Sequence, residues 1–225
     1  MTETATPATL TAPEPAPIRP AEFAAYLAAR MCHDFISPAS AIVSGLDLLE
    51  DPTAQDMRDD AMDLIAASAR KLSDLLLFTR VAFGASASAE SFDARELEKL
   101  TQGVFAHMRA ELDWQVETPS VNKPAARTLL NLAQIAGAAL PTGGTAKVRV
   151  VQTGDTLSIV LEATGPRARL RPEVQAGLRG EGPGDGLHGH WVQARYVHLF
   201  ITDAGGQLSA EVGEETVTLA ATIPA

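Results

Sequence analysis

The sequence has little of several features that mark particular classes of protein. A single cysteine, Cys32, cannot form an internal disulfide, which favours a reducing, cytoplasmic location. No apolar run approaches the roughly 20 residues that span a bilayer, so no membrane association is expected. Positive charge is in deficit, because 18 lysines and arginines face 28 aspartates and glutamates for a net charge of -10. This deficit argues against a nucleic-acid partner.

The 225 residues nevertheless suffice for a folded core, because 46% of them are hydrophobic. Only 5% are aromatic and alanine is frequent, a composition typical of closely packed helices. Residues 1–20 hold five prolines and lack both the cationic start and the apolar segment of a secretory signal. We therefore expect a disordered, proline-rich tail over residues 1–20, with folded domains after it.

Two long helices are expected next, over residues 21–50 and 54–83, each about 45 Å long. Only Asp51-Pro52-Thr53 separates them, and Gly84 follows the second. So short a break folds the helices back on each other as an antiparallel hairpin, a domain of residues 21–84. A lone hairpin would leave the apolar face of its second helix bare, so we expect two copies to form a dimeric four-helix bundle. That face consists of Leu64, Ile65, Leu72, Leu75, Leu76 and Phe83.

The pattern changes after the linker-like residues 84–91. Asp93 and Glu96 resemble a capping box, and Gly154-Asp155 separates two β-branched runs as a hairpin turn would. Residues 92–225 are therefore expected to fold as an α/β sandwich with mainly antiparallel strands, which makes the whole chain α+β. The expected elements are helices over residues 93–112, 124–140 and 191–203, strands over residues 147–151, 157–161, 207–212 and 216–223, and mostly loop over residues 169–186.

His33 lies in the first helix, on the side away from its apolar stripe. On a helical wheel it falls roughly 190° from the centre of that stripe, so its ring should face water. A neutral histidine ring is a nucleophile, and small side chains around it leave room for another protein's active site. From composition alone, a surface histidine without a function is the alternative. The stripe consists of Leu27, Met31, Phe35, Ile42, Leu46 and Leu49.

The neighbours of His33 favour a function. The run His33-Asp34-Phe35-Ile36-Ser37-Pro38 resembles the H-box of dimeric histidine kinases, in which histidine precedes an acidic residue, an apolar residue and, five positions on, proline. The longer stretch from Arg30 to Asp51 resembles the ChpT-type histidine phosphotransferases of alphaproteobacteria. That resemblance extends over nearly the whole chain after the tail, including residues 81–90 and 191–193.

The resemblance implies a phosphorelay. His33 would take a phosphoryl group from the receiver domain of a hybrid histidine kinase (CckA-like) and pass it to an aspartate of response regulators (CtrA-like and CpdR-like) in cell-cycle control. The protein would be a homodimer that binds no cofactor itself, with Mg²⁺ supplied by the partner receiver domain. Asp34 would orient the His33 ring or raise its basicity. Arg30, Ser37 and Ser40 are the expected docking contacts, and Arg30 would also offset phosphate charge.

The same resemblance makes the second domain a degenerate ATPase-like sandwich of the histidine-kinase type. Such domains carry a helix with a pattern like Asn-Leu-Leu-x-Asn-Ala, whose second asparagine holds magnesium. Here residues 131–136 place Ile135 at that position, and isoleucine offers no oxygen ligand. In the following Asp-x-Gly-x-Gly motif, residues 163–167 place Ala163 at the aspartate and Arg167 at the second glycine. We therefore expect no ATP binding.

Two other functions remain as alternatives. The chain could be an ATP-dependent histidine kinase, which measurable Mg·ATP affinity with autophosphorylation would favour. It could also be a non-catalytic adaptor that binds receivers without accepting phosphate, which continued signalling by a His33→Ala variant would favour.

Several further side chains have a structural interpretation. A zinc site at His188, His190 and His198 is disfavoured, since no cysteine or carboxylate set accompanies them and histidines beside glycine in loops are usually solvated. Cys32 points about 100° away from His33 and is expected to be a small packed residue. The residues interpreted as structural, in the core or at interfaces, are His107, Trp114 and Trp191.

Overall fold

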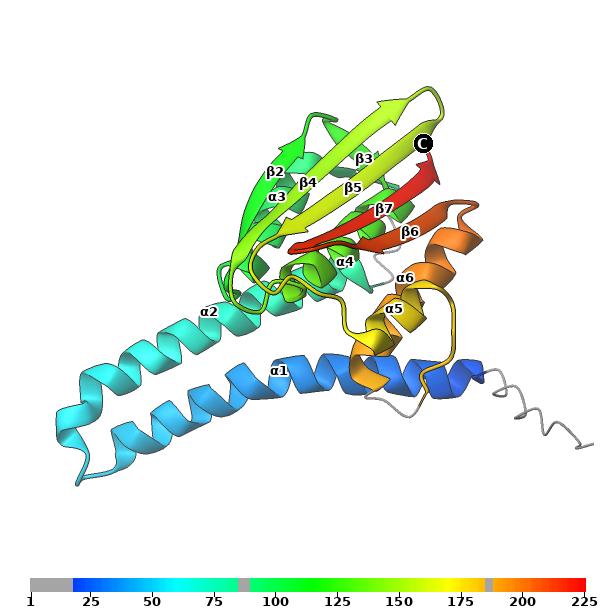
Figure 1. Cartoon of the computed structure of the whole chain (residues 1–225). Helices are drawn as coiled ribbons and strands as arrows, with labels where there is room; N and C mark the ends of the chain where they lie inside the picture. Colours follow the sequence, from blue (N-terminus) through cyan, green and yellow to red (C-terminus); the bar gives the residue numbers. More distant parts are fainter. Residues whose placement is uncertain (1–17, 85–89, 185–187) are drawn as a thin grey trace, which may run out of the picture.

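The computed structural model describes residues 18–84, 90–184 and 188–225, and it begins with the predicted hairpin. Helix α1 spans Pro20–Glu50 and helix α2 spans Arg58–Ala82, with a 3₁₀ turn, η1 at Gln55–Met57, between them. The hairpin of α1, η1 and α2 forms a long arm that projects from the rest of the molecule (Figure 1). Most of the predicted tail, residues 1–17, and residues 85–89 of the predicted linker lie outside the described residues.

Local sequence explains where the two helices begin and end. Pro20 stands in the first turn of α1, where its missing N–H is not needed. Asp59 and Asp60 lie in the first turn of α2 and Arg80 in its last turn, so the charge at each end suits the helix dipole. Although Pro38 removes one hydrogen bond from its interior, α1 continues without a break.

Small residues let the two helices approach closely. Gly45 of α1 is buried, and a Cβ atom there would lie 2.6 Å from Ile65 Cγ1 and 3.1 Å from the backbone oxygen of Ala61. Ala61 and Ser68 of α2 are buried as well. The contact between the helices is therefore narrow, and it leaves other apolar side chains of the hairpin exposed.

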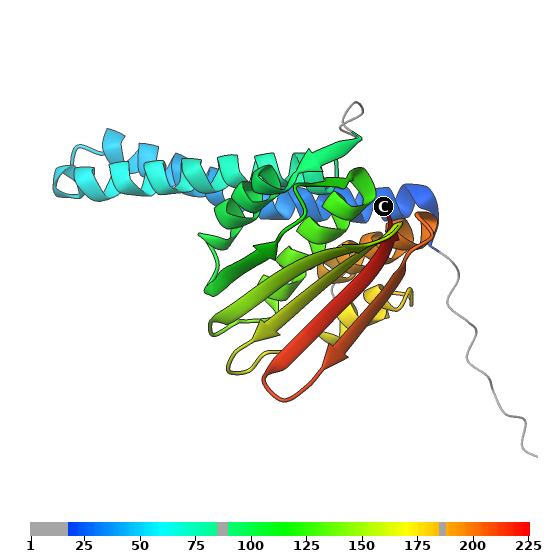
Figure 2. The same cartoon turned by 90° about the horizontal axis from the view of Figure 1, so that it is seen from above.

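The rest of the described chain, residues 90–184 and 188–225, forms a five-stranded sheet with helices packed on one face, called the sandwich below (Figures 1 and 2). The strand order is β2-β4-β5-β7-β6, in which β2 and β4 are parallel and the other pairs antiparallel. Helices α3 and α4 lie between the sheet and the hairpin (Figure 2). The elements are β1 (Ser91–Asp93), α3 (Ala94–Phe105), β2 (Ala110–Val116), β3 (Ser120–Asn122), α4 (Lys123–Ala138), β4 (Gly144–Thr153), β5 (Thr156–Thr164), α5 (Pro172–Leu178), α6 (His188–Asp203), β6 (Gln207–Val212) and β7 (Thr216–Pro224).

The local signals within the sandwich mostly have the predicted effect. Asp93 caps α3, since its side chain accepts hydrogen bonds from the backbone N–H groups of Arg95 and Glu96. Strands β4 and β5 form the predicted antiparallel hairpin, and Gly154 in its turn has a φ of 57° that suits glycine. Alternate residues of β5 and β7 are buried, so one face of the sheet supplies the core.

One prediction of secondary structure is wrong, and another missed a short helix. The helix expected over residues 93–112 ends at Phe105, and residues 110–116 form β2 instead. This strand exists because it pairs with β4, a contact between distant residues that local pattern does not reveal. The segment 169–186, expected to be mostly loop, forms no helix or strand in its described residues apart from the seven-residue helix α5. Its residues 185 and 186 lie outside the described residues.

Helix α4 joins the sandwich to the hairpin. The fully buried Asn131 donates from Nδ2 to the backbone oxygen of Ala82, the last residue of α2, over 3.0 Å. Its Oδ1 accepts from Nε2 of Gln193 on α6 over 3.3 Å. Arg127, one turn earlier on α4, donates to the backbone oxygen of Gly84. These bonds fix the end of α2 against two helices of the sandwich.

Candidate functional site

His33 lies in the first half of α1, on the surface of the hairpin. Its side chain is 84% exposed, which confirms the exposure predicted from the helical wheel. Ser37 and Ser40, the expected docking residues, are exposed on the same helix. The small hydroxyl side chains leave the imidazole open to the approach of a second protein.

Asp34 lies against one side of the ring. Its Oδ1 is 3.5 Å from His33 Nδ1, at the outer limit of a hydrogen bond. In the tautomer whose proton is on Nδ1, that nitrogen donates to Asp34 and Nε2 keeps its lone pair. The side chain of Asp34 is only 27% exposed. The pair therefore combines a reachable nucleophilic nitrogen with a carboxylate behind it.

Arg30, an expected docking residue, is directed toward other parts of this chain. Its side chain is 16% exposed, and Nε donates to Asp34 Oδ2 over 2.8 Å. Its Nη1 donates to the backbone oxygen of Gly189 over 3.3 Å and to His190 Nδ1 over 2.9 Å, both at the start of α6. Arg30 therefore ties the His33 side of α1 to the sandwich.

A groove of about 260 Å³ opens beside His33. Lys71 of α2 contributes an ammonium group to its wall, and His107 contributes an imidazole from the turn after α3. His107 Nε2 donates to Asp74 Oδ2 of α2 over 3.0 Å, so this histidine has the structural role expected of it. The groove places positive charge next to the exposed ring. Its lining residues are Arg30, His33, Asp34, Ser37, Lys71, Leu75, Val104, His107, Met108 and Gln134.

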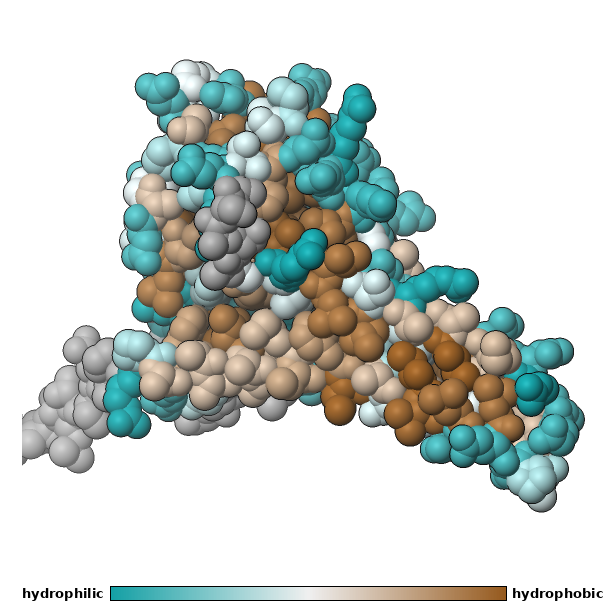
Figure 3. Space-filling view, turned by 180° about the vertical axis from the view of Figure 1, so that it is seen from behind, coloured by the Kyte–Doolittle hydropathy of each residue, from teal (hydrophilic) through white to brown (hydrophobic). Residues whose placement is uncertain are grey.

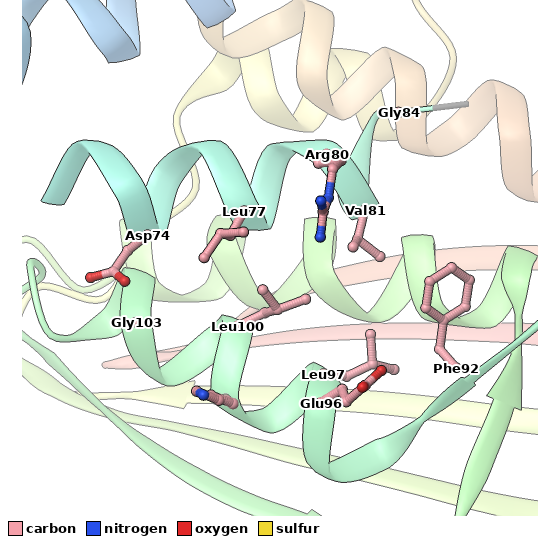
Figure 4. Close-up of a pocket in the computed structure, with 11 residues that line it drawn as sticks. Asp74, Leu77, Arg80, Val81, Gly84, Phe92, Glu96, Leu97, Leu100 and Gly103 are labelled. Atoms are coloured by element: carbon pink, nitrogen blue, oxygen red, sulfur yellow. The ribbon is translucent and has the colours of Figure 1, made fainter. Parts of the chain in front are cut away.

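A second groove, of about 720 Å³, lies between α2 and α3 (Figure 4). Its walls are mainly apolar and include Leu77, Leu97 and Leu100, with charged side chains around them. Asp74 lines this groove and also binds His107, so that pair stands between the two grooves. Among the described residues, the lining of the second groove contains no histidine, cysteine or hydroxyl side chain.

The cavity at the position expected for a magnesium ligand is small. Ile135, at the expected metal-ligand position, is buried and lines a cavity of about 120 Å³ together with Arg169, Arg171 and His190. Ligand sites are typically several hundred Å³ in volume. Ala163, at the expected adenine-reading position, is fully buried near the end of β5.

At residues 163–167, where the resemblance expects a glycine motif, the backbone has one conformation that suits glycine. Arg167, at the place of the second glycine, has a φ of 63°, in the left-handed region that side chains with a Cβ disfavour. The backbone N–H of Ala168 donates to the oxygen of Gly165 over 3.1 Å and closes the turn around it. Arg167 therefore stands at a backbone position that glycine would occupy without strain.

The remaining candidates are distributed over the fold. Cys32 is exposed, so the prediction of a packed cysteine is wrong. His190 is also not the solvated loop residue expected, since it lies on α6 and binds Arg30. Trp191 is buried, as predicted, and donates from Nε1 to the backbone oxygen of Glu181. Trp114 is half-buried against the core.

Two kinds of site find no support in the described residues. No group of three or more histidine, cysteine, aspartate or glutamate side chains there could hold a metal ion. His198, one of the three histidines considered for zinc, instead donates from Nδ1 to the backbone oxygen of Leu178 over 2.9 Å. Within the same ranges, no helix has both the length and the apolar character required to cross a membrane.

Sequence reasoning missed two residues near His33. Lys71 is the only lysine of α2, but the sequence alone does not indicate that the hairpin places it in the groove beside His33. His190 is separated from Arg30 by 160 positions, and nothing in the sequence indicates that the two meet.

The chain is similar to known proteins over almost its full length. A family model for the histidine phosphotransferase C-terminal domain matches residues 94–216. The protein phosphotransferase ChpT of Brucella abortus (strain 2308) is 33% identical over 201 residues, which are 89% of this chain and 95% of that protein. The 1.7 Å structure of a bacterial phosphotransferase is 31% identical and superposes with a TM-score of 0.82, covering 92% of this chain and 99% of that one. Both of these relatives extend over the hairpin and the sandwich together.

Proposed function

Since this chain belongs to the histidine phosphotransferase family, we propose that His33 is the residue that carries the phosphoryl group between receiver domains. The observation that supports this choice is the imidazole itself, whose side chain is 84% exposed. The Asp34 carboxylate lies at its Nδ1, and the groove that contains Lys71 opens beside it. His107 and His198 are bonded to other parts of this chain, and His190 is bonded to Arg30.

The transfer would start from the aspartyl phosphate of a donor receiver. The lone pair of His33 Nε2 attacks phosphorus in line, and a P–N bond forms as the P–O bond to the donor breaks, which releases the donor carboxylate. The ring then carries positive charge, and Asp34 stabilises it by accepting the hydrogen bond from Nδ1–H. The second transfer reverses these bond changes on the aspartate of an acceptor. This chain has mainly to orient the ring, because most of the catalysis of phosphoryl transfer is positioning and electrostatics.

The donor in this proposal is the receiver of a hybrid histidine kinase (CckA-like), and the acceptors are response regulators (CtrA-like and CpdR-like). Mg²⁺ would come with the receiver. Ser37 lines the groove beside the ring, and Ser40 is exposed about one turn further along α1; both are proposed to contact the docked receiver. A cytoplasmic location belongs to the proposal, because receivers act there and the single Cys32 needs no oxidising compartment.

We also propose that the chain acts as a homodimer through the hairpin. Of ten large apolar side chains exposed among the described residues, eight lie on the hairpin. Seen from behind, hydrophobic surface gathers on the outer half of the hairpin (Figure 3). Met62, Ala69 and Leu76 follow one another on α2 at seven-residue spacing, which places them on one stripe. Two hairpins paired about a twofold axis would bury this surface as a four-helix bundle and leave both His33 rings outside.

Phosphate transfer without ATP completes the proposal. The cavity at Ile135 is far smaller than a nucleotide site, and Ala163 offers no carboxylate to adenine. The sandwich would then serve to hold the hairpin and to position residues beside His33.

The test mixes the purified full chain with a receiver domain that carries a radioactive acyl phosphate. We expect this chain to gain acid-labile label within seconds to minutes, and His33→Ala to abolish it. His198→Ala is the matched control, because it removes another histidine far along the sequence and should keep the label.

The other outcomes separate the alternatives. Label that persists in His33→Ala would refute His33 as the carrier. A chain that binds receivers but never gains label would be the non-catalytic adaptor. Label gained from Mg·ATP alone, with no receiver present, would identify an ATP-dependent histidine kinase.

A further inference from the structure

Arg30 bridges the hairpin and the sandwich beside the proposed phosphorylation site. Its Nε donates to Asp34 Oδ2 over 2.8 Å, and its Nη1 donates to His190 Nδ1 over 2.9 Å. Asp34 directs its other oxygen, Oδ1, to Nδ1 of His33 at 3.5 Å. A continuous line of polar contacts therefore runs from α6 through Arg30 and Asp34 to the exposed ring.

The contact with Arg30 specifies the state of His190. An arginine side chain has hydrogen-bond donors only, so His190 Nδ1 must be an acceptor with a free lone pair. The ring is then neutral and its proton is on Nε2. Protonation of Nδ1 would put an N–H group and a positive charge against the guanidinium, and the contact would be lost.

We propose that His190 is a positioning residue for phosphotransfer, which holds Arg30 so that Arg30 holds Asp34 against Nδ1 of His33. This inference rests on the proposed function of His33. Without the acceptor at His190, Arg30 keeps only the longer bond to Gly189 on that side. The Asp34 carboxylate then loses a fixed partner, and it can rotate away from the His33 ring more freely. The sandwich thereby acts on a reaction that takes place on the hairpin.

The surroundings of His190 support a neutral ring. Burial, followed by the charges of Arg30 and Arg171, lowers the pKa of His190 below its usual 6.5, while Glu173 and Asp34 oppose this effect. A lowered pKa in the folded state means that the contact is fully present above about pH 6.5 and is lost as the pH falls through the lowered value. The charged side chains around His190 come from α1, from the loop before α5 and from α5: Arg30, Asp34, Arg169, Arg171 and Glu173.

The experiment compares His190→Ala with His190→Asn in the full-length protein. The initial rate of His33 phosphorylation is measured at pH 7.5 over a range of phosphorylated receiver concentrations. We expect His190→Ala to lower the maximal rate about tenfold, because a poorly oriented group costs rate more than binding, and to leave the half-saturating receiver concentration within about twofold. Asparagine can place its Oδ1 near the position of Nδ1, so His190→Asn should recover most of the rate.

The pH profile gives a second readout that a purely structural role would not change. Below pH 6.5 the wild-type rate should fall more steeply than that of His190→Asn, since asparagine does not titrate. Any fall in the transfer rate of His190→Asn at low pH would come from titratable groups that the variant and the wild-type protein have in common.

His198→Ala is the matched control, because it truncates another histidine of α6, one that contacts α5 instead of α1. It should keep the wild-type rate and pH profile, and thermal unfolding checks that each variant is folded. The inference is overturned if His190→Ala transfers at the wild-type rate, if His190→Asn is as slow as His190→Ala, or if His198→Ala is equally slow. A wild-type chain that gains no label would refute the proposed function itself.

Discussion

Helix α1 of the hairpin has only two buried residues among 31, whereas α4 of the sandwich has eleven among 16. The sandwich encloses its apolar side chains between the sheet and the helices, and its core needs no second molecule. The hairpin instead leaves Ile36, Val43 and Leu46 of α1 and several residues of α2 exposed. The two regions therefore differ in how they treat their apolar side chains: the sandwich buries them within itself, and the hairpin leaves many of them exposed.

The difference explains why the candidate site lies on the hairpin. A phosphoryl carrier has to present its nucleophile to another protein, and an extended helical arm does this more readily than a packed sheet. The sandwich contributes two contacts near this site: His190 accepts a hydrogen bond from Arg30, and His107 lines the groove beside His33. Three predictions test this division, from the largest expected effect to the smallest.

The largest effect is expected when the hairpin surface is made polar. Replacing Leu46 and Met62, which are 46% and 52% exposed, with glutamate should convert a dimer into a monomer, because burial of unpaired charge costs several kcal/mol. Light scattering after gel filtration measures the mass. Val151→Glu, at an equally exposed apolar residue of β4, should stay dimeric. A wild-type chain that is monomeric at about 50 μM would contradict the proposed bundle.

A smaller effect is expected where the two regions join. Asn131→Ala leaves the backbone oxygen of Ala82 without its side-chain donor and removes one of the two acceptors of the Gln193 amide, which should lower the free energy of unfolding by about 1–3 kcal/mol. Urea unfolding provides the measurement. Gln115→Ala on β2, where the amide binds only the exposed Asp113, should change stability by less than about 0.5 kcal/mol. Equal effects of the two substitutions would show that the joint contributes little.

The smallest effect is a gain within the sandwich. Arg167→Gly relieves a left-handed backbone at φ 63° and should raise the free energy of unfolding by about 0.5 kcal/mol, after the entropy cost of glycine is subtracted. Arg167→Ala removes the same guanidinium but keeps the strain, so it should bring no gain. If both variants are equally stable, the φ of this residue is not a source of strain. Urea unfolding measures the stability of both Arg167 variants.

The elements that follow from local pattern were predictable. The periodic apolar residues of α1 and α2 define a hairpin, and Asp93 and Gly154 mark a helix start and a turn through their own chemistry. Strand β2 was not predictable, because residues 110–116 are extended only through pairing with β4. Helix α5 is short and lies in a glycine- and proline-rich segment, so its local signal is weak.

The sequence by itself determined that His33 would face solvent, because its angle to the apolar stripe depends only on helical periodicity, and the ring is exposed as that angle requires. It also determined which residues stand where the resemblance expects nucleotide ligands, Ile135 and Ala163, since these are matters of residue identity. Only the tertiary structure decided that Arg30 turns inward to His190 and that Lys71 and His107 share a groove with His33. Contacts between residues so far apart arise from how the helices pack, and helix packing depends on the whole chain at once.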